Sequence, residues 1–323
     1  MIGKLSASIS HLYQFCKSFV IYRYYSCKLR KIDYFQYGVL VEKIFPAPKS
    51  FASVTAYGNY KAVASLKKSS FNFFTEFLEH GISFSTNTDS CEKQGYINRP
   101  YIRKVYTFGN ERKQIIKKYL KNKGLKREVI TVGPYIKGAK FFKSEKEIQK
   151  LKEKFGKTLL VFPSHSTHDI DSVYDRNELI EEIKRVSINF NTVLICLYWK
   201  DILTGKHTIY ESAGLKIVTA GYGNDPAFLS RLKDLIEISS QTMSNNIGTH
   251  IGYSVCMDKP HYLYTQKSEH LTANKQEKFE PDHSYHEIKK QFELIFGNYS
   301  EVITPEQLEL VKKYWGEWGE VKS

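Results

Sequence analysis

Short apolar runs alternate with helical patterns through the second half of the chain, and this alternation restricts the possible folds most strongly. Strands are predicted at 158–162 (TLLVF), 192–197, 215–219, 242–244 and 261–264. Helical spacing of apolar residues falls between them, at 177–188, after Pro226 and at 247–257. Strands joined by helical crossovers become parallel neighbours in one sheet, so the sequence predicts a doubly wound α/β domain.

A strand–helix–strand unit is also predicted in the first half. The runs 104–108 (KVYTF) and 128–132 are predicted as strands. Between them Asn110 is predicted to cap a helix that ends at Asn122, before Gly124. Two more helices are predicted at 284–296 and 305–316. The predicted fold class is therefore α/β, with two Rossmann-like domains and a cleft between them.

Charge is divided unequally along the chain. Residues 1–157 hold 31 Lys and Arg against 11 Asp and Glu, a net charge of +20, whereas the remaining residues hold 17 against 23, a net −6. This break supports four predicted regions: a basic N-terminal domain (1–137), a linker (138–157), a second domain (158–300) and a C-terminal helix (301–323). A basic half favours an anionic partner, either a membrane surface or an acidic acceptor.

Several classes of protein are disfavoured. Nucleic-acid binding ranks low, because the chain has no zinc-finger spacing, RNP-like motif or basic heptad run. The five cysteines are scattered without CxxC spacing, which argues against structural zinc or disulfides and for a cytoplasmic protein. No run of eighteen apolar residues spans a bilayer. Residues 1–31 have six basic side chains and no acid, so they suit either a peripheral helix on the inner membrane or a first core helix.

Ligands of doubly wound domains bind where strands end, so the residues after each strand are candidates. The loop 163–171 (PSHSTHDID) follows the first strand of the second domain, and it either binds phosphate or only caps the next helix. Its candidate donor ligands are Ser164, His165, Ser166 and His168. Asp169 and Asp171 form a DxD pair, but this pattern is common by chance, so no metal ion and no other cofactor is predicted.

The later strands end in further candidates. Tyr198 and Lys200 follow the second strand, where aromatic residues either stack on a base or sugar or pack at a domain interface. Gly221 follows the third strand and lets the backbone approach a ligand or form a turn. The fourth strand leads into a helix start that favours anions, with candidates Ser244, Asn245, Gly248, Thr249 and His250. The alternative there is a capped core helix, with Gly252 allowing close packing.

In the first domain the segment 77–82 (FLEHGI) holds a candidate catalytic base. His80 lies between an apolar helix end and a glycine turn, and Glu79 is close enough in sequence to tune it. A solitary histidine is more often structural than catalytic, so both interpretations stay open at this point.

The order of these motifs resembles a known family. His80-Gly81, a strand-end Ser164-His165 and the later Ser244…Gly248-Thr249 resemble GT-B glycosyltransferases of bacterial surface polysaccharide, in the layout of polysialyltransferases and CDP-glycerol glycerophosphotransferases. The resemblance implies that His80 is the acceptor-activating base and that the later motifs hold the donor phosphates. Ser166 follows His165 where the family has proline, which puts the donor type in doubt.

The predicted function is an inverting glycosyltransferase of capsule or lipopolysaccharide biosynthesis. Its expected partners are a CMP-, UDP- or GDP-linked sugar donor, used as a co-substrate, and a glycan or lipid-linked oligosaccharide acceptor. Two alternatives remain: a polyol-phosphate transferase using a CDP-glycerol-type donor, and a non-enzymatic module that binds glycan or nucleic acid. A retaining mechanism with Asp169 or Asp201 as nucleophile also remains open.

Overall fold

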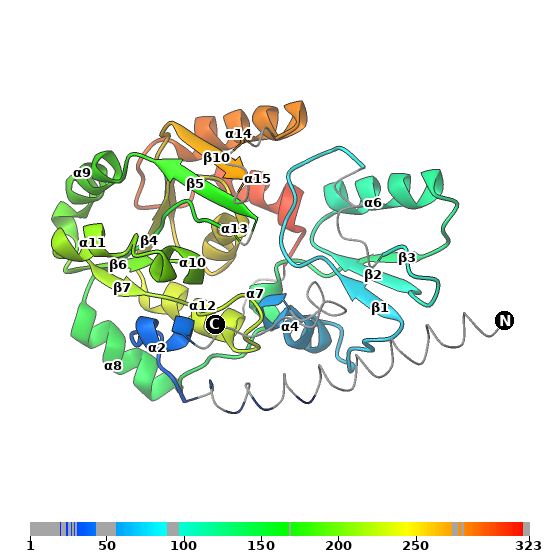
Figure 1. Cartoon of the computed structure of the whole chain (residues 1–323), viewed down its shortest axis with the longest axis horizontal. Helices are drawn as coiled ribbons and strands as arrows, with labels where there is room; N and C mark the ends of the chain where they lie inside the picture. Colours follow the sequence, from blue (N-terminus) through cyan, green and yellow to red (C-terminus); the bar gives the residue numbers. More distant parts are fainter. Residues whose placement is uncertain are drawn as a thin grey trace.

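The structure, a computed structural model, describes residues 31–42, 56–88, 97–167, 169–272, 277–278 and 281–318, together with Val20, Tyr24, Cys27 and Leu29. Two parallel sheets organise these residues, with helices packed around them (Figure 1). The α/β class with parallel sheets is therefore confirmed. None of the helices in this described part combines the length and apolarity that a membrane span needs.

The smaller sheet has the order β1-β2-β3, from β1 (Glu76–Leu78), β2 (Lys104–Thr107) and β3 (Glu128–Thr131). Both pairs are parallel, and the first residues of the three strands are in register. Helix α6 (Asn110–Asn122) connects β2 to β3. The two predicted strands and the helix of this unit are confirmed, although the N-cap is Gly109 rather than Asn110.

The larger sheet has the order β7-β6-β4-β8-β9. Its strands are β4 (Thr158–Phe162), β6 (Thr192–Cys196), β7 (Lys216–Val218), β8 (Gln241–Ser244) and β9 (His261–Leu263). All neighbours are parallel, which confirms the five predicted strands. Strand β4 is central and entirely buried, because its apolar residues have neighbours on both faces. The winding direction reverses beside β4, so the loop after it lies where such sheets bind ligands.

The helices follow the predicted pattern. Asp175 caps α9 with its side chain, and Ser144 and Thr304 form capping boxes at α8 and α15. The remaining elements are short and connect the sheets to these helices. The bounds are α2 (Tyr37–Glu42), η1 (Ala56–Gly58), α4 (Asn59–Leu66), α7 (Tyr135–Gly138), α8 (Glu145–Phe155), α9 (Arg176–Val186), η2 (Ser187–Asn189), α10 (Trp199–Leu203), α11 (Thr208–Ser212), α12 (Phe228–Ile238), α13 (Thr249–Cys256), α14 (His283–Phe296) and α15 (Pro305–Trp315).

One expectation of local structure was wrong, and one pair of strands was missed. Phe77 and Leu78 end the buried strand β1, not a helix, because a two-residue apolar run carries no period that separates strand from helix. An antiparallel pair of β5 (Ile170–Tyr174) and β10 (Ser268–Thr272) was not predicted. Each of these strands is stabilised by pairing with the other, and the two are distant in sequence, so a local pattern does not reveal them.

One apolar core joins the two sheets. It includes Val105 of β2 and Leu160 of β4, and it continues through α13 and α15. The segment predicted as a linker contains α8, which packs on α12, and the predicted C-terminal helix contains α15, which contacts both α6 and α13. The domain limits at residues 137, 157 and 300 stay a prediction.

Gly252 permits the closest of these helix contacts. A Cβ atom at this position of α13 would lie 2.2 Å from ring carbons of Trp315, which is fully buried in α15. The close packing expected at Gly252 is therefore made with α15.

We expect Gly252→Ala to lower the free energy of unfolding by about 1–3 kcal/mol, because overpacking a rigid ring outweighs the helix preference of alanine. Urea unfolding measures this difference. Gly38→Ala in α2 is the matched control, since no atom lies within 4 Å of its added Cβ. A Gly252→Ala variant as stable as wild type would contradict the packing described.

Candidate functional site

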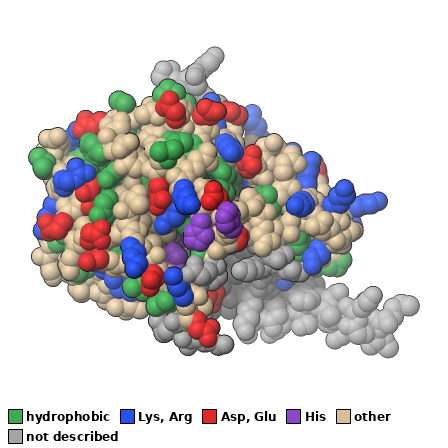
Figure 2. Space-filling model, turned by 90° about the horizontal axis from the view of Figure 1, so that it is seen from above, with side chains coloured by type: hydrophobic (Ala, Val, Ile, Leu, Met, Phe, Trp, Pro, Cys, Tyr) green, Lys and Arg blue, Asp and Glu red, His purple; other side chains and the backbone are tan. Residues whose placement is uncertain are grey.

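Loops at the carboxyl ends of the two sheets meet one another. The Ile82 amide, just after β1, donates to Thr249 Oγ1 at the start of α13 (3.2 Å). The Tyr57 amide in η1 donates to the carbonyl of Gly223, in the loop after β7 (2.5 Å). The segment that follows β1 accordingly runs between the two sheets in Figure 1. Figure 2 shows histidine and charged side chains gathered near the middle of the face seen from above.

His80 lies at this junction with an exposed imidazole. Its ring centroid is 6.3 Å from that of Tyr57, and its carbonyl accepts from Asn59 Nδ2 (2.7 Å). Surrounding protein atoms withdraw part of the ring from water and lower the pKa of His80, against the opposing charge of Glu79. A neutral histidine with an accessible ring has the properties of a general base near neutral pH.

Glu79 is buried and paired. Its carboxylate accepts from Arg112 Nε (2.7 Å) and from Thr107 Oγ1 (2.6 Å), and Glu79 and Arg112 are 1% and 2% exposed. Because these partners occupy the carboxylate inside the protein, Glu79 is placed to fix the end of β1 and not to meet a substrate.

A chain of ring contacts joins His80 to the second sheet. The hydroxyl of Tyr57 lies 3.5 Å from that of Tyr198, which follows β6. Tyr198 in turn packs against His165, with ring centroids 4.9 Å apart. His165 follows β4 and is exposed. The structure thus brings the two predicted histidines to one junction, on opposite sides of a tyrosine pair.

The loop after β4 is held rigidly by buried polar groups. The Ser164 amide donates to Asn245 Oδ1 (2.6 Å), and its hydroxyl lies 2.7 Å from that of Ser172. The Ser166 amide donates to Asp201 Oδ2 (2.9 Å). Ser164 and Ser166 are buried, so these contacts fix the loop backbone and leave His165 as its exposed side chain.

Two lysines extend over this loop. Lys200 is paired with Asp171 (2.7 Å), and Lys206 contacts both Asp201 (3.1 Å) and the Ser166 hydroxyl (2.7 Å). The pKa of His165 is lowered by the surrounding protein, partly offset by the charge of Asp201. The site therefore places two ammonium groups and a neutral imidazole beside the loop that follows β4.

The start of α13 contributes on the other side of β4. Gly248 is its N-cap, and the ring of the next-but-one residue, His250, packs over it. Burial lowers the pKa of His250 to about 3, and protonation of the nearby His165 would lower it further. His250 Nε2 is buried without a hydrogen-bond partner among the described residues. This buried ring nitrogen lies close to the start of α13.

Other predicted residues are less available to a ligand. Ser244 is fully buried, and its hydroxyl donates to the Asn246 carbonyl (3.0 Å) and contacts His261. Gly221 has φ +99° and is buried beside Arg231, which explains the glycine by a turn. His168 lies outside the described residues. Among the residues that the structure describes, no cluster of three metal-ligating side chains occurs.

Sequence reasoning missed several residues of the junction. His270 of β10 lies 3.4 Å from Asn246 Nδ2, and Tyr285 donates to Asn246 Oδ1 (3.3 Å). Tyr57 and Lys206 were missed as well. Only Tyr57 left a signal in the sequence, because Gly58 follows it and indicates a turn. The structure shows that turn, with Tyr57 at φ +59°. The others reach the site through contacts between distant segments.

No protein-family model matches the chain, and no curated protein sequence matches it. Two crystal structures of Anabaena HepE show a partial likeness. The complex with UDP and glucose is 15% identical, with a TM-score of 0.33, over 59% of this chain and 53% of that chain. The complex with UDP is 14% identical, with a TM-score of 0.35, over 74% and 68%. The chain thus spans about half the length of HepE in the first comparison, and TM-scores this low identify neither family nor activity.

Proposed function

We propose that the protein is a glycosyltransferase that moves a sugar from a nucleotide-sugar donor to a glycan acceptor. One observation carries the proposal: His80 and His165, on the carboxyl edges of two different parallel sheets, are both exposed at a junction connected through Tyr57 and Tyr198. Two substrates that approach from opposite sheets would meet at such a junction. The GT-B arrangement and the resemblance to surface-polysaccharide enzymes agree with it as sequence-based hypotheses.

The nucleotide-sugar donor is assigned to the loops at the carboxyl edge of the larger sheet. The rigid loop around Ser166, the ammonium groups of Lys200 and Lys206, and the amide end of α13 would stabilise the negative charge that develops on the departing nucleotide. His165 would donate a hydrogen bond to a phosphate oxygen. Tyr198 offers a ring face beside it for the base or sugar.

The glycan acceptor is assigned to the carboxyl edge of the smaller sheet, beside His80. His80, neutral at working pH, would take the proton of the attacking hydroxyl while the nucleotide leaves from the opposite face of the sugar, which inverts the anomeric centre. Glu79 acts as a positioning residue, since Arg112 and Thr107 hold its carboxylate. The acceptor is proposed to be a surface polysaccharide or its lipid-linked precursor, handled on the cytoplasmic side of the inner membrane.

A thermal-shift series tests the donor site. We expect one of CMP, CDP, UDP, GDP or their sugar conjugates to raise the Tm by several degrees, because about a hundredfold excess over Kd stabilises the folded state by about 2.7 kcal/mol. His165→Ala should remove most of the shift, and His286→Ala, an exposed histidine on α14, should leave it intact.

The same series separates the alternatives. A response to CDP-glycerol with release of CMP would replace sugar transfer by polyol-phosphate transfer. A protein that responds to none of these compounds, at concentrations up to millimolar, would contradict the proposal.

A further inference from the structure

A basic surface lies at the opposite edge of the smaller sheet from His80. The three strands are parallel and begin in register at Glu76, Lys104 and Glu128, so the segments just before them share one edge. The Arg103 amide donates to the Thr75 carbonyl (2.7 Å), which places these segments side by side. We call this surface the basic edge; it comprises Phe74, Tyr101, Arg103, Lys121, Lys126 and Arg127.

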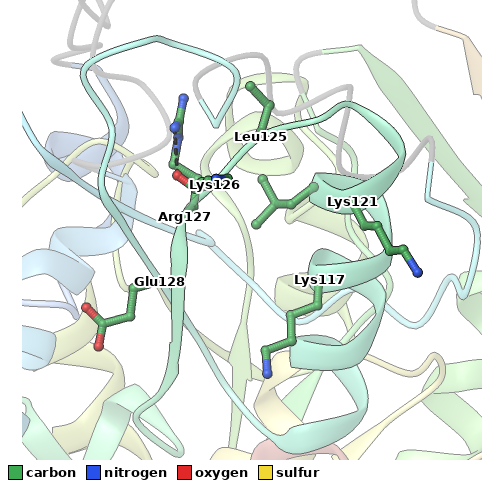
Figure 3. Close-up of a pocket in the computed structure, with 7 residues that line it drawn as sticks. Lys117, Lys121, Leu125, Lys126, Arg127 and Glu128 are labelled. Carbon is green, nitrogen blue, oxygen red and sulfur yellow. Dashed lines mark hydrogen bonds between the residues drawn. The ribbon is translucent and has the colours of Figure 1, made fainter.

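The basic edge contains a pocket of about 520 Å³ between the end of α6 and the start of β3. Leu120 and Leu125 contribute its apolar lining, and the cations Lys117, Lys121, Lys126 and Arg127 surround it. Figure 3 shows Lys117 and Lys121 extending from the helix and Glu128, the single acid of the lining, pointing away from them. The pocket therefore presents positive charge around an apolar floor.

The charges of this pocket are not neutralised locally. Glu128 is paired with Lys104 (3.8 Å), and no carboxylate of the described residues forms an ion pair with Lys117, Lys121 or Lys126. Arg127 is fixed in place, since its guanidinium donates to the carbonyls of Arg99 (3.1 Å) and Lys126 (2.8 Å). A pocket lined by four cations and one acid favours an anionic partner.

Two aromatic side chains accompany the cations. Phe74 is 49% exposed and Tyr101 is 39% exposed, and they precede β1 and β2 at the same edge. Exposed aromatic residues among Lys and Arg are typical of surfaces that lie in the headgroup region of a bilayer, where rings bury their apolar part and ammonium groups meet lipid phosphates.

We propose that the basic edge binds an anionic phospholipid membrane peripherally. The proposal does not depend on the proposed function. Because the strands run away from this edge toward His80, a membrane bound here leaves the junction of the two sheets accessible.

Co-sedimentation of the full chain with vesicles tests this proposal. We expect binding to phosphatidylcholine vesicles that contain one quarter phosphatidylglycerol, weaker binding as salt is raised, and none to pure phosphatidylcholine. Lys121→Gln with Lys126→Gln should weaken binding roughly 30-fold, since each cation near such a surface contributes about 1 kcal/mol. Phe74→Ser should weaken it without changing the salt dependence.

Lys146→Gln with Lys150→Gln is the matched control, because it removes the same charge from exposed positions on α8. This control variant should change vesicle binding less than twofold, because cations far from the membrane surface contribute little to binding. The proposal is overturned if both pairs weaken binding equally, if anionic vesicles are not bound, or if single-stranded RNA competes fully through Lys121 and Lys126. Nucleotide-dependent Tm shifts report separately on the proposed function.

Discussion

His80→Gln is expected to lower kcat/KM for sugar transfer by about 10²–10⁴-fold, the usual contribution of a positioned general base. Glutamine keeps much of the size and polarity of the imidazole but cannot accept the proton. Because His80 follows β1 of the smaller sheet and the donor is assigned to the larger one, the nucleotide-dependent Tm shift should be unchanged. Initial rates with a saturating donor measure the effect.

The pH profile supplies a second readout. The protein around His80 lowers its pKa from the ordinary value of 6.5, so the neutral, proton-accepting form should persist to more acidic pH than for a free histidine. The midpoint of the acid limb should therefore lie below pH 6.5, and this limb should be absent from the residual activity of His80→Gln. His283→Gln, at a highly exposed position of α14, is the control and should keep the wild-type rate and profile. Full transfer activity in His80→Gln would exclude His80 as the general base.

Arg112→Met is expected to lower the free energy of unfolding by about 3–5 kcal/mol, because it leaves the carboxylate of Glu79 buried without its counter-charge. The pair is almost fully buried, with Arg112 Nη2 2.7 Å from Glu79 Oε1. Loss of this ion pair should also lower transfer activity, since the position of the neighbouring His80 depends on the end of β1. Chemical denaturation measures the stability.

Two comparisons make this result specific. Lys184→Met removes an exposed ion pair with Glu181 and should cost less than about 1 kcal/mol. Adding Glu79→Gln to Arg112→Met should recover part of the loss, because a neutral amide still accepts from Thr107 and carries no buried charge. An Arg112→Met protein as stable as Lys184→Met would contradict the assigned role of the pair.

Local patterns sufficed for most of the secondary structure. The run 158–162 is apolar after Thr158, and a strand buried on both faces is the conformation that such a short run adopts in a parallel sheet. The same patterns placed His165, Tyr198 and Thr249 after strands, and parallel strands end at one edge, so their proximity followed from topology alone. The wrong helix before His80 arose where the apolar run was too short to show a period.

The sequence by itself thus determined the α/β class, the five-stranded sheet and the edge at which polar loops gather, because these depend on periodicity within about twenty residues. The tertiary structure alone decided which loops meet. Ile82 and Thr249 are 167 residues apart, and the pairing of β5 with β10 joins Tyr174 to Ser268, 94 residues later. It also decided that Glu79 is bound to Arg112 instead of facing a substrate, since a buried charge takes the partner that packing brings to it.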